Sequence, residues 1–398
     1  MVKKLLPQVL LAITLTIVSC SKDPVEEVLH ERNTVVDPIR PSAETEPADP
    51  IESISEADKP GNWIDQMQES NGLLRSSEYH DFVSLYDNAL SAIWFTSKGE
   101  LSKTKKILDF FDGKVQSELL SGSGGFYQFR NSNGENGSRT WMGDNAWLLI
   151  AINQYHEVSG NQKYQHMADA LENWLRSLQD EDGGLWGGIN EDGSQIPKVT
   201  EGMITAFNAV KGYDNFHKNI LTFIKLNRWN ADGEHLLAWP ENPKYENALD
   251  MHSLGFMIFE DFPQATLDTS EMFLNTQELT LSGEMVTGYC FDTDKDVVWL
   301  EGTAQMAIAF QVGGHVSNSN QLLTDLEKTF ISSTTLTEAK GIPYTTNFGT
   351  TYGSNLLWDH ADLTPALSST IWYLFAKTGF SPLEIGRSKN VPVEDKFW

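Results

Sequence analysis

The chain has 398 residues, 40% of them hydrophobic and 11% aromatic, which is enough to bury the core of one large domain. Its 55 acidic residues outnumber 29 Lys and Arg and give a formal charge of −26, which disfavours nucleic acid and anionic lipid surfaces as partners. The two cysteines, Cys20 and Cys290, exclude a disulfide framework, and we expect Cys290 to be a small buried apolar residue.

Residues 1–19 have the layout of a secretory signal peptide. Lys3 and Lys4 precede an apolar run that ends at Ser19, and this run is too short to span about 30 Å of hydrocarbon. Cleavage before Cys20 would remove both lysines and take the formal charge from −26 to −28. Residues 17–20, Ile-Val-Ser-Cys, resemble the lipobox of bacterial lipoproteins, which implies that Cys20 is acylated and anchors the chain to a membrane.

Residues 20–60 have the composition of a disordered acidic tether. Positions 21–60 hold 11 acids against 4 Lys or Arg, six prolines and no aromatic residue, so this segment cannot bury enough apolar surface to fold. The acids that follow Cys20 also resemble the surface-export signal of Bacteroidetes lipoproteins. The resemblance implies an outer-membrane lipoprotein that faces the cell surface rather than the periplasm. We expect the folded domain to occupy residues 61–398.

From residue 61 onward, apolar residues recur at helical spacing in pairs of segments separated by Gly-rich turns. The predicted pairs are 79–95 with 100–111, 144–157 with 162–179, 200–211 with 215–225, 247–259 with 269–277, and 300–312 with 319–331, and an eleventh helix covers 364–377. Eleven or twelve helices in sequential hairpins predict an all-α fold, a closed (α/α)6 toroid. Short Gly-rich segments at 124–130 and 183–188 are predicted to form strands or loops at the mouth of the ring.

Several motifs resemble the six-hairpin glycosidase superfamily over about residues 75–385. They are Trp-Met-Gly-Asp-Asn-Ala-Trp at 141–147, Gly-Gly-Leu-Trp at 183–186, Thr-Glu-Gly at 200–202, Trp-Leu-Glu-Gly-Thr-Ala-Gln at 299–305, and the segment from His360 to Pro382. The resemblance implies a toroid that acts on sugars held at the mouth of the ring. It selects no single activity among glycoside hydrolases, unsaturated glucuronyl hydrolases, epimerases and polysaccharide lyases.

Polar residues in the first turn of an inner helix would face the cavity at the mouth, so these positions supply the site candidates. The predicted catalytic residues are Asp144, Glu201, Glu301 and His360. The predicted substrate-binding residues are Arg130, Arg139, Trp141, Asn145, Asp250, His252, Trp299, Tyr352 and Trp358. Each carboxylate also has a purely structural interpretation, because Asp and Glu are favoured in any first helical turn.

Three enzymatic functions remain open at the level of sequence. A glycoside hydrolase would use two carboxylates from different hairpins, such as Asp144 with Glu201 or Glu301. A lyase or dehydratase acting by β-elimination on uronic acids would need Arg or Asn against the substrate carboxylate and a His or Tyr as base, and His360 between two acids is the preferred base. An epimerase would use His252 with His360.

The remaining alternative is a surface lipoprotein that binds glycans for an uptake system without catalysis. It explains the abundant aromatic residues equally well, but a binder of neutral sugar needs few acids at the helix starts. The sequence shows no pattern of metal ligands and no phosphate-binding loop, so we predict no metal and no cofactor. The predicted partners are a carbohydrate substrate, a membrane through the lipid anchor alone, and glycan-uptake machinery.

Overall fold

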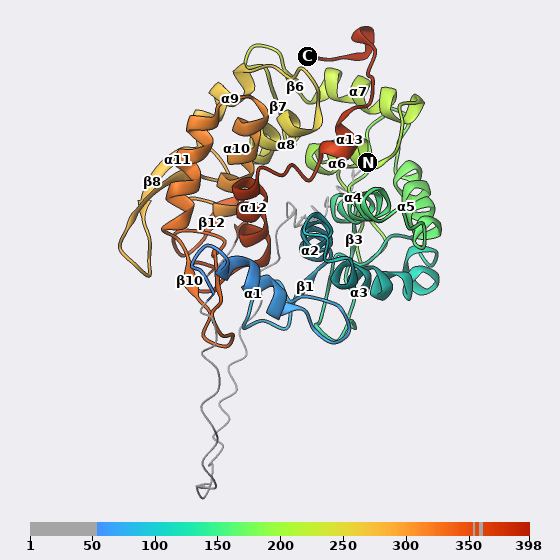
Figure 1. The fold of residues 1–398 in the computed structure, drawn as a ribbon. Helices are drawn as coiled ribbons and strands as arrows, with labels where there is room; N and C mark the ends of the chain where they lie inside the picture. The colour runs from blue at the N-terminus through green and yellow to red at the C-terminus, as the bar shows by residue number, and fades with distance from the viewer. Residues whose placement is uncertain (1–53, 353–354, 358–360) are drawn as a thin grey trace, which may run out of the picture.

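The computed structural model describes residues 54–352, 355–357 and 361–398, and these form a ring of helices in two layers (Figure 1). The inner layer consists of α2 (Leu85–Ser97), α4 (Met142–Ser159), α6 (Thr200–Ala209), α8 (Asp250–Ile258), α10 (Leu300–Val312) and α12 (Leu367–Thr378). The outer layer consists of α1 (Lys59–Met67), α3 (Leu101–Asp112), α5 (Gln165–Ser177), α7 (Asn215–Asn227), α9 (Ala265–Thr269) and α11 (Val316–Glu327).

The inner helices close into a ring because each packs against the next and α12 packs against α2. Each of the outer helices α3, α5, α7, α9 and α11 packs against the inner helix that precedes it in the chain, and α3 and α11 also contact the next inner helix. Helix α1, the first in the chain, completes the outer layer by packing on the last inner helix, α12. The predicted (α/α)6 toroid is confirmed.

The two layers differ in how their helices are buried. Every residue of α6 and of α8 is buried, as expected for a helix enclosed between neighbours on the ring and an outer helix. The outer helix α5 instead buries a stripe with helical spacing, Met167, Ala168, Leu171, Trp174 and Leu175. The core therefore lies between the layers and along the ring axis.

The inner helices all begin at one end of the ring, which we call the mouth, and short antiparallel strands precede several of them there. The strands are β1 (Val83–Ser84), β2 (Phe129–Arg130), β3 (Thr140–Trp141), β4 (Gly188–Ile189), β5 (Gln195–Ile196), β6 (Trp229–Asn230), β7 (His235–Leu236), β8 (Leu274–Glu278), β9 (Met285–Tyr289), β10 (Ile331–Ser332), β11 (Lys340–Gly341), β12 (Thr350–Tyr352) and β13 (Asn355–Leu357). They pair as β1–β2, β3–β4–β5, β6–β7, β8–β9, β10–β11 and β12–β13.

The opposite end of the ring, which we call the far end, is crossed by residues 379–383, the strap (Figure 1). The strap links α12 to the short helix α13 (Glu384–Arg387). Gly379 ends α12 in the left-handed conformation, with φ 67°, and so turns the chain toward the axis. Leu383 is fully buried on the axis, and the amide of Asn208 in α6 donates to its carbonyl over 3.0 Å.

Three predicted bounds or elements differ from the structure. The first inner helix, expected over 79–95, begins at Leu85, directly after strand β1. The fourth outer helix, expected at 269–277, is the short α9 followed by a 3-10 turn (Ser270–Phe273) and then by strand β8. Helix α1 begins at Lys59, so the expected domain boundary at residue 61 lies inside this helix. Cys290 is fully buried as predicted.

Three predicted functional residues, Cys20, Trp358 and His360, lie outside the described residues. In the part of the chain that the structure describes, no helix is both long enough and apolar enough to cross a bilayer.

Candidate active site

Five of the six inner helices present a carboxylate from their first turn, and we call these residues the acid cluster. Its members are Asp87 in α2, Asp144 in α4, Glu201 in α6, Asp250 in α8 and Glu301 in α10. All five are buried, with at most 4% of their surface exposed. The helices begin at the mouth, so the closed ring brings the five acids to the same end of the ring, where free amides and the helix dipoles favour negative charge.

Asp144 is the acid most strongly affected by this environment. Burial raises the pKa of its carboxyl group well above the ordinary value, the charges of Glu201 and Asp87 raise it further, and Arg139 partly opposes them. Neither side-chain oxygen of Asp144 accepts a well-formed hydrogen bond from a described residue. Burial and the neighbouring charges therefore both favour the protonated form of the Asp144 carboxyl group.

Asp250 has the same character. Burial, followed by the charges of Glu201 and Glu301, raises the pKa of Asp250 to about 8. The charge of Glu201 thus raises the pKa values of both Asp144 and Asp250, and its helix, α6, lies between theirs in the ring. Among the described residues, no group of three or more His, Cys, Asp or Glu is arranged to hold a metal ion.

Glu301 is fixed in place by a chain of hydrogen bonds across the ring. The hydroxyl of Tyr86 in α2 donates to Glu301 Oε1 over 2.7 Å and accepts from the indole nitrogen of Trp372 in α12, also over 2.7 Å. Gln305, one turn further along α10, donates to the same oxygen over 3.3 Å. The Glu301 carboxylate thereby takes one defined position.

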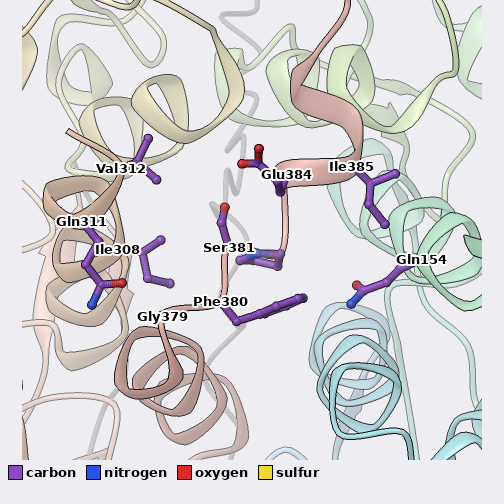
Figure 2. Close-up of a pocket in the computed structure, with 10 residues that line it drawn as sticks. Gln154, Ile308, Gln311, Val312, Gly379, Phe380, Ser381, Glu384 and Ile385 are labelled. Atoms are coloured by element: carbon purple, nitrogen blue, oxygen red, sulfur yellow. The ribbon is translucent and has the colours of Figure 1, made fainter. Parts of the chain in front are cut away.

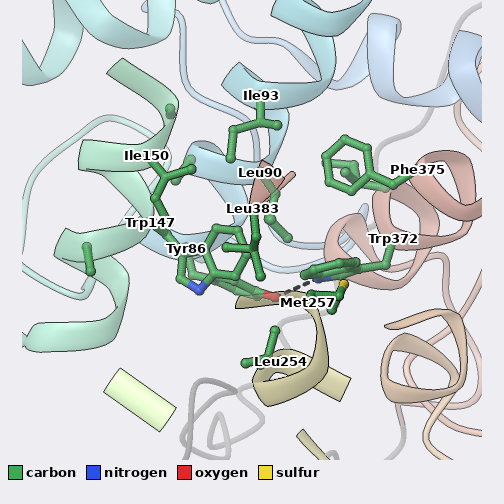
Figure 3. Packing of buried hydrophobic residues seen from close by; sticks show 14 of the residues in the cluster. Tyr86, Leu90, Ile93, Trp147, Ile150, Leu254, Met257, Trp372, Phe375 and Leu383 are labelled. Carbon is green, nitrogen blue, oxygen red and sulfur yellow. Dashed lines mark hydrogen bonds between the residues drawn. The ribbon is translucent and has the colours of Figure 1, made fainter. Parts of the chain in front are cut away.

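Below the acids, aromatic side chains close the ring axis (Figure 3). The ring of Trp147 meets Tyr86 edge-on at 5.6 Å between centroids and meets Trp372 edge-on at 5.7 Å. Figure 3 shows aliphatic side chains packed around these rings, with Leu383 of the strap among them. The aromatic side chains therefore fill the ring axis, and the acids lie on the mouth side of this aromatic floor.

The positive charge of Arg139 lowers the pKa of Asp144 and so partly opposes the effect of burial. Its Nε donates to Gln128 Oε1 over 2.7 Å, and its guanidinium lies over the ring of Trp141 at 5.2 Å. Trp141 precedes α4 and is almost fully buried with Ile196 and Val199. The structure therefore places Arg139 beside Asp144, whereas Trp141 supports the arginine from a small apolar cluster.

The glycine that follows each inner glutamate allows close packing, as the two Glu-Gly pairs suggest. A Cβ on Gly302 would lie 2.1 Å from the ring of Trp299 and 2.7 Å from Leu249. A Cβ on Gly202 would lie 2.6 Å from the terminal methyl of Met142 and 3.2 Å from the backbone nitrogen of Gly143. Trp299 is thus held against α10 by its own packing.

Four predicted substrate-binding residues have contacts elsewhere, and we do not carry them into the proposed site. Arg130 pairs with buried Glu118 at 2.9 Å. Asn145 donates to the carbonyls of Phe126 and Trp141 and accepts from the Phe126 amide, so it holds the Gly-rich loop.

His252 faces the outer layer. Its Nδ1 bonds to the carbonyl of Thr266 at 2.9 Å, and its ring stacks on His235 at 5.1 Å. Burial lowers the pKa of His252 to about 4, so this histidine is neutral. Tyr352 donates its hydroxyl to the carbonyl of Tyr245 over 2.9 Å, and its ring packs on Tyr245 and Phe291.

The structure adds residues that the sequence reasoning missed, namely Asp87, Tyr86, Trp147 and Trp372. A signal for Asp87 is present in the sequence, because Ser84-x-x-Asp87 and Trp141-x-x-Asp144 place an acid at the same position of consecutive inner helices. Tyr86 and the tryptophans carry no such signal, since their contacts join helices that lie far apart in the chain.

Comparisons with known proteins relate this chain to carbohydrate-active enzymes through the fold. An alpha-amylase from Clostridium perfringens is similar over 81% of this chain and 96% of its own, with 11% identity and a TM-score of 0.59. A wild-type glycosidase matches 79% of this chain and 93% of its own at 13% identity and a TM-score of 0.55. A cellobiose 2-epimerase from Bacillus thermoamylovorans matches 80% and 95% at 11% identity and 0.53.

No protein-family model matches the sequence, and no curated protein matches it. At such low identity, the structural likeness supports the toroid fold and carries no residue role from those proteins to this chain.

Proposed function

We propose that this chain is a glycoside hydrolase that cleaves poly- or oligosaccharides, with Asp144 as general acid and Glu301 as general base. The observation that carries the proposal is that Asp144, a buried carboxyl group whose pKa is raised well above its ordinary value, lies in the same cluster as Glu301, whose carboxyl group is held by a hydrogen bond from Tyr86. Hydrolysis of a glycosidic bond needs such a pair, because one group protonates the leaving oxygen while the other activates water. The glycosidases with this fold support the same class of reaction.

The choice of Glu301 over Glu201 as base follows from the ring. Helices α4 and α10 are three places apart in either direction around the six-helix ring, so Asp144 and Glu301 approach the axis from opposite walls. Glu201 comes from α6, next to α4, and its charge raises the pKa of Asp144. A sugar between opposite walls can receive a proton from Asp144 on one side and water activated by Glu301 on the other.

A second candidate, β-elimination on a uronic acid, is favoured by Arg139 alone. Its guanidinium near Asp144 could neutralise a substrate carboxylate. Two of the bases considered for this reaction, His252 and Tyr352, make their hydrogen bonds to backbone carbonyls. The epimerase alternative would also use His252, which makes this backbone hydrogen bond instead. Hydrolysis therefore stands first.

The test uses a panel of neutral and uronic-acid oligosaccharides, with detection of new reducing ends and of the ultraviolet absorbance of a new C4–C5 double bond. We expect reducing ends without that absorbance. Asp144→Ala should lower turnover of oligosaccharides by about 10²–10⁴-fold but act far less on dinitrophenyl glycosides, whose leaving group needs no proton. Glu301→Ala should lower turnover of both, and azide should restore it, because azide attacks without a base.

Asp169→Asn, on the exposed face of outer helix α5, is the matched control and should leave all rates unchanged. New double-bond absorbance would favour elimination instead. If Asp144→Ala keeps full activity on oligosaccharides, Asp144 is not the general acid.

The location of this activity is also a proposal, made from the sequence. A signal peptide, an acylated Cys20 and an acidic tether of about 40 residues would hold the ring near a membrane, where it can reach glycans outside the cell. Replacing Cys20 with Ser should release the protein from the membrane fraction.

A further inference from the structure

A pocket of about 480 Å³ lies at the far end of the ring, which the proposed chemistry does not use (Figure 2). It is formed by the last turns of α4 and α10, by the strap and by the start of α13. Its lining residues are Gln154, Ile308, Gln311, Val312, Gly379, Phe380, Ser381, Pro382, Glu384 and Ile385. Small-molecule sites typically have volumes of about 300–1,000 Å³, so this pocket can hold one or two sugar units.

The pocket is separate from the acid cluster. Gln154 follows Asp144 by ten residues on the same helix, which places it about 15 Å further along the helix axis. The aromatic floor and Leu383 fill the axis between the two ends (Figure 3). A ligand in this pocket would therefore bind independently of the substrate at the mouth.

Two buried polar atoms in the pocket have no partner among the described residues. Gln154 is 3% exposed, and its side-chain oxygen accepts no hydrogen bond. The hydroxyl of Ser381 is likewise buried and unpartnered. Burying such groups without partners costs about 1–3 kcal/mol each, so these atoms favour a ligand that donates hydrogen bonds.

The other walls define the chemistry of that ligand. Figure 2 shows the Gln154 amide directed toward the Phe380 ring, with Ser381 and Glu384 on the strap side. None of the described lining residues is Lys, Arg or His, and Glu384 is acidic, so the pocket disfavours anions. Acceptors for hydroxyl groups beside one aromatic ring suit a neutral sugar.

We propose that the far-end pocket is a second saccharide-binding site for a neutral sugar unit, held by Gln154, Ser381 and Phe380. Such a site would keep a glycan chain bound while the mouth acts on another part of it, or on another chain. The proposal does not depend on hydrolysis at the mouth.

The test follows isoleucine methyl signals by NMR in the mature chain carrying Asp144→Asn, so that no substrate is consumed. Ile308 and Ile385 line the far-end pocket, and Ile204 lies in the turn after Glu201 and reports on the mouth. Maltotetraose, cellotetraose and mannotetraose are titrated separately. We expect at least one of them to shift the Ile308 and Ile385 signals.

Gln154→Leu should weaken that response by about tenfold or more, through the loss of a buried hydrogen bond. Ser381→Leu, which fills the pocket, should abolish it. Gln162→Leu on the exposed surface is the matched control and should leave it unchanged. Unchanged Ile204 signals in the variants show that the fold is intact.

The proposal is overturned if none of the three saccharides shifts the Ile308 and Ile385 signals, or if Gln154→Leu and Ser381→Leu respond like the parent chain. Shifts at Ile204 alone would show binding at the mouth only, which also overturns it. A failure to hydrolyse any glycan would count against the proposed function and leave this result as it stands.

Discussion

At the scale of single residues, Asp250 links the acid cluster to the stability of the fold. Its ordinary pKa is 3.8, whereas the folded chain raises it to about 8. Between these values the unfolded chain has lost the proton and the folded chain has kept it. The free energy of unfolding should therefore fall as the pH rises, by up to about 1.4 kcal/mol per pH unit from this group.

Asp250→Asn should remove this contribution. Relative to the parent chain, the variant should gain stability as the pH is raised from about 5 to about 7, because the amide never ionises. Urea unfolding at both pH values measures the effect. Asp268→Asn, an exposed acid on α9, is the matched control and should give the parent's pH dependence. An equal pH dependence in the parent and in Asp250→Asn would show that burial does not perturb this carboxyl group.

The position of a residue in a first helical turn could be predicted from the sequence, but the direction of its side chain could not. Asp144, Glu201, Asp250 and Glu301 were predicted because helical spacing places them in first turns, and the structure brings all four together. Asn145 and His252 lie in the same first turns, but Asn145 bonds to the Gly-rich loop and His252 to α9. The direction of a side chain around a fully buried helix leaves no pattern in the sequence. Tyr86 was missed because its partners, Glu301 and Trp372, are more than 200 residues away in the chain.

At the scale of elements, the two Glu-Gly helices provide a matched comparison. Gly302→Ala would drive a methyl group into the rigid ring of Trp299, whereas Gly202→Ala meets mainly the flexible end of Met142. Both changes gain about 1 kcal/mol of helix propensity. Overpacking costs about 1–3 kcal/mol where neighbours cannot move, so Gly302→Ala should lower the free energy of unfolding and Gly202→Ala should change it little.

Chemical denaturation of the two variants checks this difference. Gly302→Ala should also lower activity, because Glu301 shares the same helical turn, and far-ultraviolet circular dichroism should show the helices unchanged. Equal stabilities of the two variants would contradict the packing argument.

The elements themselves were predictable where burial is uniform. The inner helices are apolar on nearly all sides, so their existence and approximate bounds follow from the sequence. The prediction of the fourth outer helix was wrong at its end, because residues 274–278 form strand β8, which pairs with β9 and alternates between exposed and partly buried positions. Helix α1 was missed since its polar start, Lys59 and Pro60, continues the composition of the tether, and only packing on α12 identifies it.

At the scale of the whole molecule, the closure of the ring makes the two ends depend on one shared core. Side chains from α2, α4, α8 and α12 meet on the axis, and Leu383 reaches them from a strap near the end of the chain (Figure 3). A linear array of helix pairs could unfold from either end. In the closed toroid, α1 and α12 join the two ends of the folded chain, so we expect a single cooperative transition.

Leu383→Ala tests this cooperativity. The substitution leaves a cavity on the axis and should cost about 2–5 kcal/mol of the free energy of unfolding. Ile385→Ala, two residues later and 49% exposed, should cost about 0.5 kcal/mol or less. Tryptophan fluorescence and circular dichroism should report the same shifted midpoint for Leu383→Ala, since all the inner helices contribute side chains to one shared core. Two separate transitions would instead show that the strap stabilises only the helices it touches.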